Sequence, residues 1–355
     1  MSGNALRWAT ESGRNCPGVT RDVAAAGFPR WDVVWLVTFT QERPDGRHNN
    51  PWPGVSLSRA EQTLEDADRQ NPSWKKPAMQ RYEPNLSLTG RLLLAALFLW
   101  AAFHKVFNPE GTLQYMTAYG LTTGTMLLYL AATVVEFAGG IALALGHTTR
   151  ETVLLLILFM LMVTGIFHTD LTDPNQVIQF VKNVAIIGSL LYVGAYGPGS
   201  LSMDAQPGAS GKGAITEFSH PAVSLAARIL IGGLFFVSAM NAIFDTEGAR
   251  RYRAEMGTVH ETALLYAGGV LLETAGLLSL LLGWRARAGA AALIIFLIAV
   301  TIMFHRTSMS FVLDATIQDQ QFHLMKNLAI MGGLTYVLAY GPGPISLDAR
   351  RSRKR

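Results

Sequence analysis

The sequence predicts an all-α integral membrane protein in which eight transmembrane helices form two four-helix bundles, arranged as a parallel repeat. Three observations predict this class. Hydrophobic residues make up 50% of the 355-residue chain. Charged residues make up 15%, whereas a soluble protein averages about 25%, and they cluster so that long uncharged segments remain. One order of motifs also occurs twice along the chain.

Residues 1–84 differ in composition from the rest of the chain. They are rich in Pro, Gly, Arg, Asp and Asn, and their apolar run Val33–Phe39 is far shorter than the roughly 20 residues that a spanning helix needs. They also lack the order of charged, apolar and small residues that marks a secretory signal. We expect a disordered cytoplasmic extension, unless the natural start is Met79.

Eight apolar segments follow, each near the length of a transmembrane helix. The Gly-, Ser-, Ala- and Lys-rich stretch at 205–221 divides them into two sets and is predicted to be a linker. The predicted units are therefore 85–204 and 222–349, followed by a basic tail at 350–355. The predicted spans are Leu88–Phe107, Thr125–Leu145, Thr152–His168, Val177–Tyr196, Val223–Phe244, Ala263–Leu282, Ala288–Phe304 and Leu324–Tyr340.

The two sets of spans form an internal repeat. Residues of the first unit recur 137 positions later up to the end of the third span, and 144 positions later beyond it. Because each unit has an even number of spans, both units begin on the same side, which predicts a pseudo-twofold axis along the membrane normal. The recurring pairs are Arg91 and Arg228, Glu136 and Glu273, His168 and His305, Lys182 and Lys326, Asn183 and Asn327, and Asp204 and Asp348.

Basic residues predict the orientation of the chain in the membrane. Arg150, Arg285, Arg287 and the five basic residues of the tail 350–355 all flank the same predicted face. By the positive-inside rule that face is cytoplasmic, as are both termini. After a hydrophobic span, such a tail is better interpreted as a topology anchor than as a nucleic-acid site, so the expected partner is the lipid bilayer.

Glu136 and Glu273 are the candidate catalytic residues. Each lies about 11 residues into its span, which places it roughly 16 Å deep, near the bilayer centre. A charged side chain there is costly and is paired, protonated or facing a polar cavity. Two interpretations stay open: transfer of protons, or a structural carboxyl that ties two helices together.

Other polar residues at the span ends are candidate ligand-binding groups. They are Lys182, Asn183, Lys326, Asn327, His168, His305, Arg91 and Arg228. The alternative for the lysines and arginines is snorkelling, in which a long side chain reaches the lipid headgroups. If the lysines instead point inward, Lys182 pairs with Glu136 and Lys326 with Glu273.

The cysteine count and the absence of known motifs limit the chemistry. Cys16 is the single cysteine, so the chain has no internal disulfide or dithiol. No further histidine pair and no C-x-x-C-H motif support haem, and no metal motif is present, so neither metal nor haem is expected. Any redox role would use a cofactor, a quinone or a partner protein. The units also differ, since His104 and Lys105 align with Asn241 and Ala242.

The repeated motifs resemble the DoxX family over about residues 86–350. "VVEFAGGIALALG" (Val134–Gly146) and "YGPGSLSMD" (Tyr196–Asp204) recur as "LLETAGLLSLLLG" (Leu271–Gly283) and "YGPGPISLD" (Tyr340–Asp348), with Lys-Asn between them. The resemblance implies a four-helix membrane bundle. The DoxD-like members of this family are the large subunit of thiosulfate:quinone oxidoreductase. Resemblance to them implies transfer of electrons from thiosulfate to a membrane quinone, together with a partner subunit.

Two functions follow from this resemblance together with the intramembrane charges. One is a quinone-linked oxidoreductase subunit with quinone as the electron acceptor and a second oxidoreductase subunit as partner. The other is a non-catalytic scaffold or small-molecule carrier. In either case we expect the protein in the cytoplasmic (plasma) membrane of a prokaryote.

Overall fold

The computed structural model of the chain describes residues 78–206, 220–244, 263–304 and 315–352. The side chains of residues 78–81, 263–265, 304 and 315–319 lie outside the description. Nearly all of the predicted extension, most of the predicted linker and His305 also lie outside it. The boundaries predicted for these parts of the chain stay predictions.

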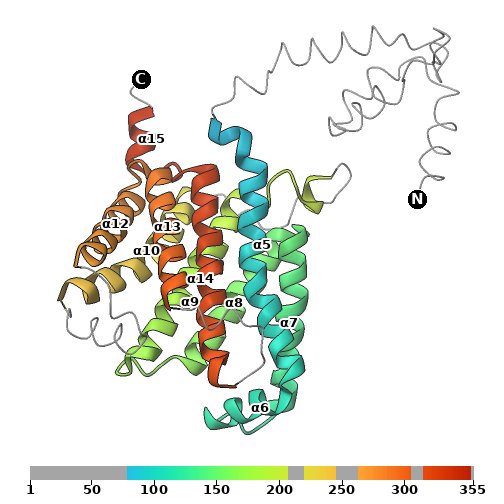
Figure 1. Cartoon of the computed structure of the whole chain (residues 1–355). Helices are drawn as coiled ribbons and strands as arrows, with labels where there is room; N and C mark the ends of the chain where they lie inside the picture. The colour runs from blue at the N-terminus through green and yellow to red at the C-terminus, as the bar shows by residue number, and fades with distance from the viewer. Residues whose placement is uncertain (1–77, 207–219, 245–262, 305–314, 353–355) are drawn as a thin grey trace, which may run out of the picture. The chain divides into compact units, whose positions relative to one another are not determined.

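Each of the eight predicted spans coincides with one long helix, and the described residues contain no strand. The all-α membrane class is thereby confirmed. The long helices, labelled in Figure 1, are α5 (Ala78–Phe107), α7 (Thr125–Leu145), α8 (Thr149–Phe167), α9 (Pro174–Tyr196), α10 (Pro221–Phe244), α12 (Ala263–Leu282), α13 (Ala286–Phe304) and α14 (Ala315–Tyr340). The short ones are α6 (Pro109–Ala118), η2 (Met203–Ala205) and α15 (Leu347–Ser352).

Six of the long helices are apolar and long enough to cross a membrane, namely α5, α7, α8, α9, α10 and α13. In α12 the apolar stretch with described side chains, Tyr266–Leu282, is shorter. The remaining helix, α14, carries Gln320, Gln321, His323 and Lys326 in its first half. Most of the α14 side chains from Gln321 onward are buried, so other helices, not lipid, surround this polar stretch.

The two units interlock through their fourth helices. Within each unit, helices that follow one another in the sequence pack together: α7 on α8, α8 on α9, α12 on α13, and α13 on α14. Between the units, α9 packs extensively on α10, the first helix of the second unit, and also on α14. Correspondingly, α14 approaches α5 closely at Gly90. The fourth helix of each unit therefore packs against the first helix of the other unit.

Small residues permit these close approaches, as is common in membrane proteins. A Cβ added to Gly188 of α9 would lie 2.8 Å from the carbonyl oxygen of Ala227 on α10. A Cβ added to Gly332 of α14 would lie 2.5 Å from the carbonyl oxygen of Gly90 on α5. Gly188 and Gly332 occupy matching positions in the repeat, so the same backbone contact is made twice.

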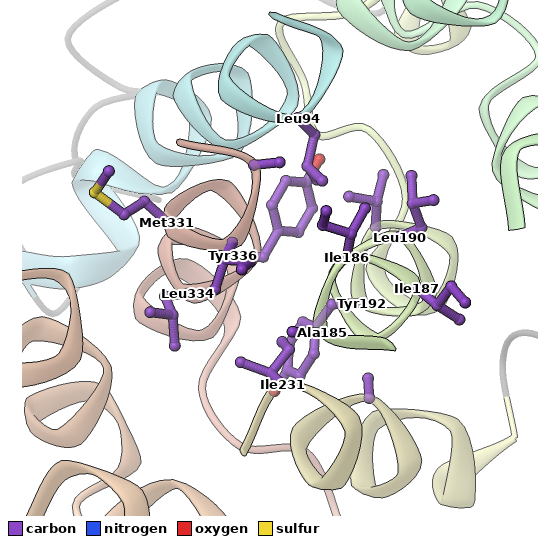
Figure 2. Close-up of a cluster of buried hydrophobic side chains, with 14 of the residues drawn as sticks. Leu94, Ala185, Ile186, Ile187, Leu190, Tyr192, Ile231, Met331, Leu334 and Tyr336 are labelled. Atoms are coloured by element: carbon purple, nitrogen blue, oxygen red, sulfur yellow. The ribbon is translucent and has the colours of Figure 1, made fainter. Parts of the chain in front are cut away.

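Buried side chains fill the space around these crossings. Figure 2 shows Tyr336 of α14 pointing toward Leu94 of α5, and Tyr192 of α9 pointing toward Ile231 of α10. All four side chains are fully buried. They form two matching pairs in the repeat, so the hydrophobic core follows the same pseudo-twofold relation as the backbone.

Gly188→Val is expected to destabilise the bundle, because its side chain would meet a backbone atom of α10 that cannot move aside. Overpacking of this kind costs roughly 1–3 kcal/mol. Gly233→Val is the matched control, since a Cβ at Gly233 of α10 meets no atom within 4 Å. Thermal unfolding in detergent should show a lower melting temperature for Gly188→Val alone. Equal melting temperatures for both variants would contradict the close crossing.

Candidate functional site

In each unit, a buried arginine binds the backbone carbonyls at the C-terminal end of the second long helix. Arg91 of α5 donates from Nη1 to the carbonyl oxygens of Leu143 (3.3 Å) and Ala144 (2.8 Å), which end α7. Its Nη2 donates to the carbonyl of Leu201. The last carbonyls of a helix lack partners within the helix, and a cation at that end is electrostatically favourable. Arg91 thus ties α5, α7 and the segment after α9 together.

The second unit repeats this arrangement. Arg228 of α10 donates to the carbonyl oxygens of Leu280 (2.9 Å) and Leu281 (3.2 Å), and to that of Ile345. Both arginines are 0% exposed. The expectation that they snorkel to the headgroups is therefore wrong. These two candidate ligand-binding residues have their guanidinium groups engaged by backbone carbonyls.

The Asp that follows each Gly-Pro-Gly caps the N-terminus of the third long helix of its own unit, α8 or α13. The Asp204 carboxylate accepts hydrogen bonds from the backbone N–H groups of Thr148 (2.8 Å) and Thr149 (2.9 Å). Asp348 accepts from Arg285 (2.8 Å) and Ala286 (3.1 Å). A carboxylate at a helix N-terminus satisfies unpaired N–H groups. The repeated Arg, Gly-Pro-Gly and Asp therefore form a structural lock.

Glu136 forms an intramembrane ion pair with Lys105. Both Glu136 carboxylate oxygens lie 2.8 Å from the Lys105 Nζ, which joins α7 to α5. The Glu136 and Lys105 side chains are 6% and 18% exposed. The predicted pairing of Glu136 with Lys182 is wrong. Lys105 lies near the end of its span, and its side chain is long enough to reach a carboxylate on the neighbouring helix.

Glu273, the counterpart of Glu136, has a different environment. Ala242 occupies the position that matches Lys105, so this unit has no lysine to pair with the carboxylate. Glu273 is 2% exposed and hydrogen-bonds with Ser238 of α10. Its Oε1 atom is buried and has no hydrogen-bond partner among the described residues. The predicted pairing with Lys326 is also wrong, because Lys326 instead contacts Gln179 of the first unit.

Lys182 and Lys326 belong to a hydrogen-bonded cluster that connects the units. Lys182 Nζ of α9 lies 2.9 Å from His323 Nδ1 of α14, and His323 Nε2 lies 3.2 Å from Gln179 Nε2 of α9. Gln179 Oε1 in turn accepts from Lys326 Nζ of α14. We call these four residues the cross-unit cluster. Both lysines are 8% exposed.

The direction of the hydrogen bonds in the cross-unit cluster depends on the Gln179 amide and on the His323 ring. A neutral histidine has one donor and one acceptor nitrogen. If Lys326 donates to Gln179 and the Gln179 amide donates to His323, then His323 donates toward Lys182. Reversing the amide reverses this series.

The two asparagines connect the third and fourth helices of their units. Asn183 Nδ2 donates to Thr164 Oγ1 of α8, and Asn327 Nδ2 donates to Thr301 Oγ1 of α13, both at 3.0 Å. Side-chain hydrogen bonds of this kind join helices inside a membrane. Their carboxamide nitrogens therefore serve helix packing.

His168 follows the end of α8, and its Nδ1 lies 2.9 Å from Gln176 Oε1 of α9. Within the part of the chain that the structure describes, no three His, Cys, Asp or Glu side chains gather as a metal site. Sequence reasoning missed three functional candidates, Lys105, Gln179 and His323. For Lys105 the sequence contained a signal, because the aligned position in the second unit, Ala242, is not a lysine.

Comparison with known proteins finds one family pattern in both halves of the chain. The DoxX family pattern matches twice, over residues 86–169 and 223–306. Inner membrane protein YqjF of Escherichia coli (strain K12) is 35% identical over 126 residues, which are 36% of this chain and 95% of the relative. Inner membrane protein YphA of the same organism is 35% identical over 127 residues, which are 34% of this chain and 89% of the relative. No solved structure matches significantly.

The helices, the parallel repeat and the intramembrane charges define a duplicated four-helix integral membrane protein. The chain belongs to the DoxX family and contains two DoxX domains. Each match covers nearly the whole relative but about a third of this chain, so each relative corresponds in length to a single unit.

Lys105→Met is expected to destabilise the first unit strongly. Removal of one partner leaves the Glu136 carboxylate buried without its cation, at a cost of roughly 3–5 kcal/mol. Lys105→Met combined with Glu136→Gln should recover most of that loss, because no charge then remains buried. Thermal unfolding of the single and double variants tests this. If the double variant were as unstable as Lys105→Met, the ion pair would not be the cause.

Proposed function

We propose that this DoxX-family protein is the quinone-binding membrane subunit of a quinone-linked oxidoreductase of the thiosulfate:quinone type. The observation that carries the proposal is the cross-unit cluster of Lys182, Gln179, His323 and Lys326. It joins titratable side chains of both units by hydrogen bonds, about two helical turns inside α9. Intramembrane ionisable residues are functional candidates by default.

The chemistry of a quinone fits such a cluster. Reduction of a quinone to a quinol takes two electrons and two protons, with one proton added at each carbonyl oxygen. Lysine and histidine can donate hydrogen bonds to a carbonyl and supply protons as negative charge develops on its oxygen. A lysine that gives its proton to the quinone can be recharged afterwards from the aqueous side.

The electrons would come from thiosulfate through a partner subunit. Two thiosulfate ions joined by a new S–S bond release the two electrons that one quinone takes up. Thiosulfate is an anion and would not enter the apolar bundle, so its oxidation belongs to the partner. In this proposal the chain itself supplies the quinone site and the protons.

A second candidate function is a non-catalytic scaffold or small-molecule carrier. It is favoured by the number of buried polar groups whose partners lie within the protein. Arg91, Arg228 and Glu136 are all engaged in contacts that stabilise helix packing. In this case the same charges would specify the arrangement of the helices and would not perform a reaction.

The quinone proposal predicts that the purified protein retains quinone and that this retention depends on the cross-unit cluster. Purification in mild detergent followed by solvent extraction measures bound quinone, and membranes carrying the protein are assayed for quinone reduction by thiosulfate. Lys182→Met with Lys326→Met should lose both properties, since the donors to the quinone carbonyl are removed.

The control for that experiment is Lys105→Met with Glu136→Gln, which removes an intramembrane lysine outside the cluster. It should retain bound quinone. Folded protein that carries no quinone and supports no thiosulfate-dependent reduction would favour the scaffold or carrier function.

A further inference from the structure

The duplication places two glutamates at matching positions with unlike partners. Glu136 faces Lys105 with both carboxylate oxygens at 2.8 Å. At the position of Lys105 the second unit has Ala242, and at the position of Ala101 it has Ser238. A cation has been replaced by a methyl group, and a hydroxyl has been added beside the carboxyl.

The Glu136 carboxyl has a cation beside it that stabilises its charged form. The Lys105 ammonium provides the opposite charge at contact distance, and both oxygens accept from it. A hydrogen-bonded pair of opposite charges is the arrangement in which buried ions are tolerated. Protonation of Glu136 would leave the lysine as the uncompensated charge, so the pair resists proton exchange.

The Glu273 carboxyl lacks that stabilisation. It is 2% exposed, its one hydrogen-bond partner among the described residues is the Ser238 side chain, and its Oε1 is buried without a partner. An ionised carboxylate in such surroundings is far more costly than the neutral acid. The Ser238 hydroxyl is uncharged and cannot replace a cation. The neutral acid also needs fewer hydrogen bonds, since a carboxylate can accept about four.

We infer that Glu273 is a protonated carboxylic acid and the proton-exchanging site of the bundle, whereas its counterpart Glu136 is a permanently charged structural residue. The two DoxX domains have thus diverged in function: the first holds an ion pair, and the second holds a transferable proton. A buried acid of this kind can give its proton to a hydrogen-bond acceptor such as a carbonyl compound, and take one back. The inference does not depend on the quinone proposal, because it concerns the state of the carboxyl in the resting protein.

The site defines a class of reagent that reacts with it. A hydrophobic carbodiimide takes the proton of a carboxylic acid on nitrogen, and the carboxyl oxygen adds to its central carbon to form an O-acylisourea. Acyl transfer from oxygen to nitrogen then gives a stable N-acylurea, with no other reactant. A carboxylate that is held in an ion pair supplies no proton and does not react.

The test is labelling of the full-length protein in membranes with dicyclohexylcarbodiimide, followed by proteolysis and mass spectrometry. We expect the label on Glu273 and none above background on Glu136. Exchange of the partner residues provides the matched control. Lys105→Ala should make Glu136 reactive, and Ala242→Lys should remove the label from Glu273.

An infrared measurement covers the case in which a variant does not fold or the reagent does not reach the site. The difference spectrum of wild type minus Glu273→Gln should contain the band of a protonated carboxyl, and that of wild type minus Glu136→Gln should not. Two results would overturn the inference: a label on Glu136 equal to that on Glu273, or the absence of the protonated band from the Glu273→Gln difference. Neither readout involves quinone turnover, so failure of the quinone proposal is seen separately.

Discussion

The bundle is governed by the requirement that a charged group inside a membrane finds its partner within the protein, because lipid offers none. Arg91 and Arg228 meet this requirement with backbone carbonyls at helix ends. Lys105 and Glu136 meet it with each other. Lys182 and Lys326 meet it through His323 and Gln179 across the two units. Polar side chains therefore form specific connections between helices that are distant in the sequence, while apolar side chains fill the core or lie on the outer surface.

Duplication explains how these polar contacts are organised. The fourth helix of each unit packs on the first helix of the other, at Gly188 and Gly332, so neither unit completes its packing alone. A fused pair keeps that relation and allows the copies to change independently. The structural lock of Arg, Gly-Pro-Gly and Asp is retained in both copies. In each unit it supplies hydrogen-bond partners for the carbonyl and N–H groups at the helix ends. By contrast, Lys105 and Gln179 are matched by Ala242 and His323. These two polar differences between the units thus lie beside the glutamates and in the cross-unit cluster, whereas the residues of the lock are the same in both units.

Sequence reasoning predicted the helices because their signal is local. An uncharged run of suitable length spans a bilayer whatever surrounds it, and all eight predicted segments are helical. It failed for the partners of the charges. Depth along a helix placed Lys182 near Glu136, but depth says nothing about rotation around the helix axis or about which helices are neighbours. Lys182 instead points to α14, and the arginines that were expected at the headgroups are fully buried.

The sequence by itself determined the fold class, the repeat and the family. Hydropathy, motif order and spacing depend only on the order of residues along the chain. It also contained the asymmetry at Lys105 and Ala242. Only the tertiary structure decided what that asymmetry means, because α5 and α7 bring Lys105 to Glu136 across 31 residues of sequence, whereas α10 and α12 bring Ser238 to Glu273. The physical reason is that the electrostatic energy of a buried charge depends on the groups within a few ångströms of it. Helix packing alone sets the distance between the charge and those groups.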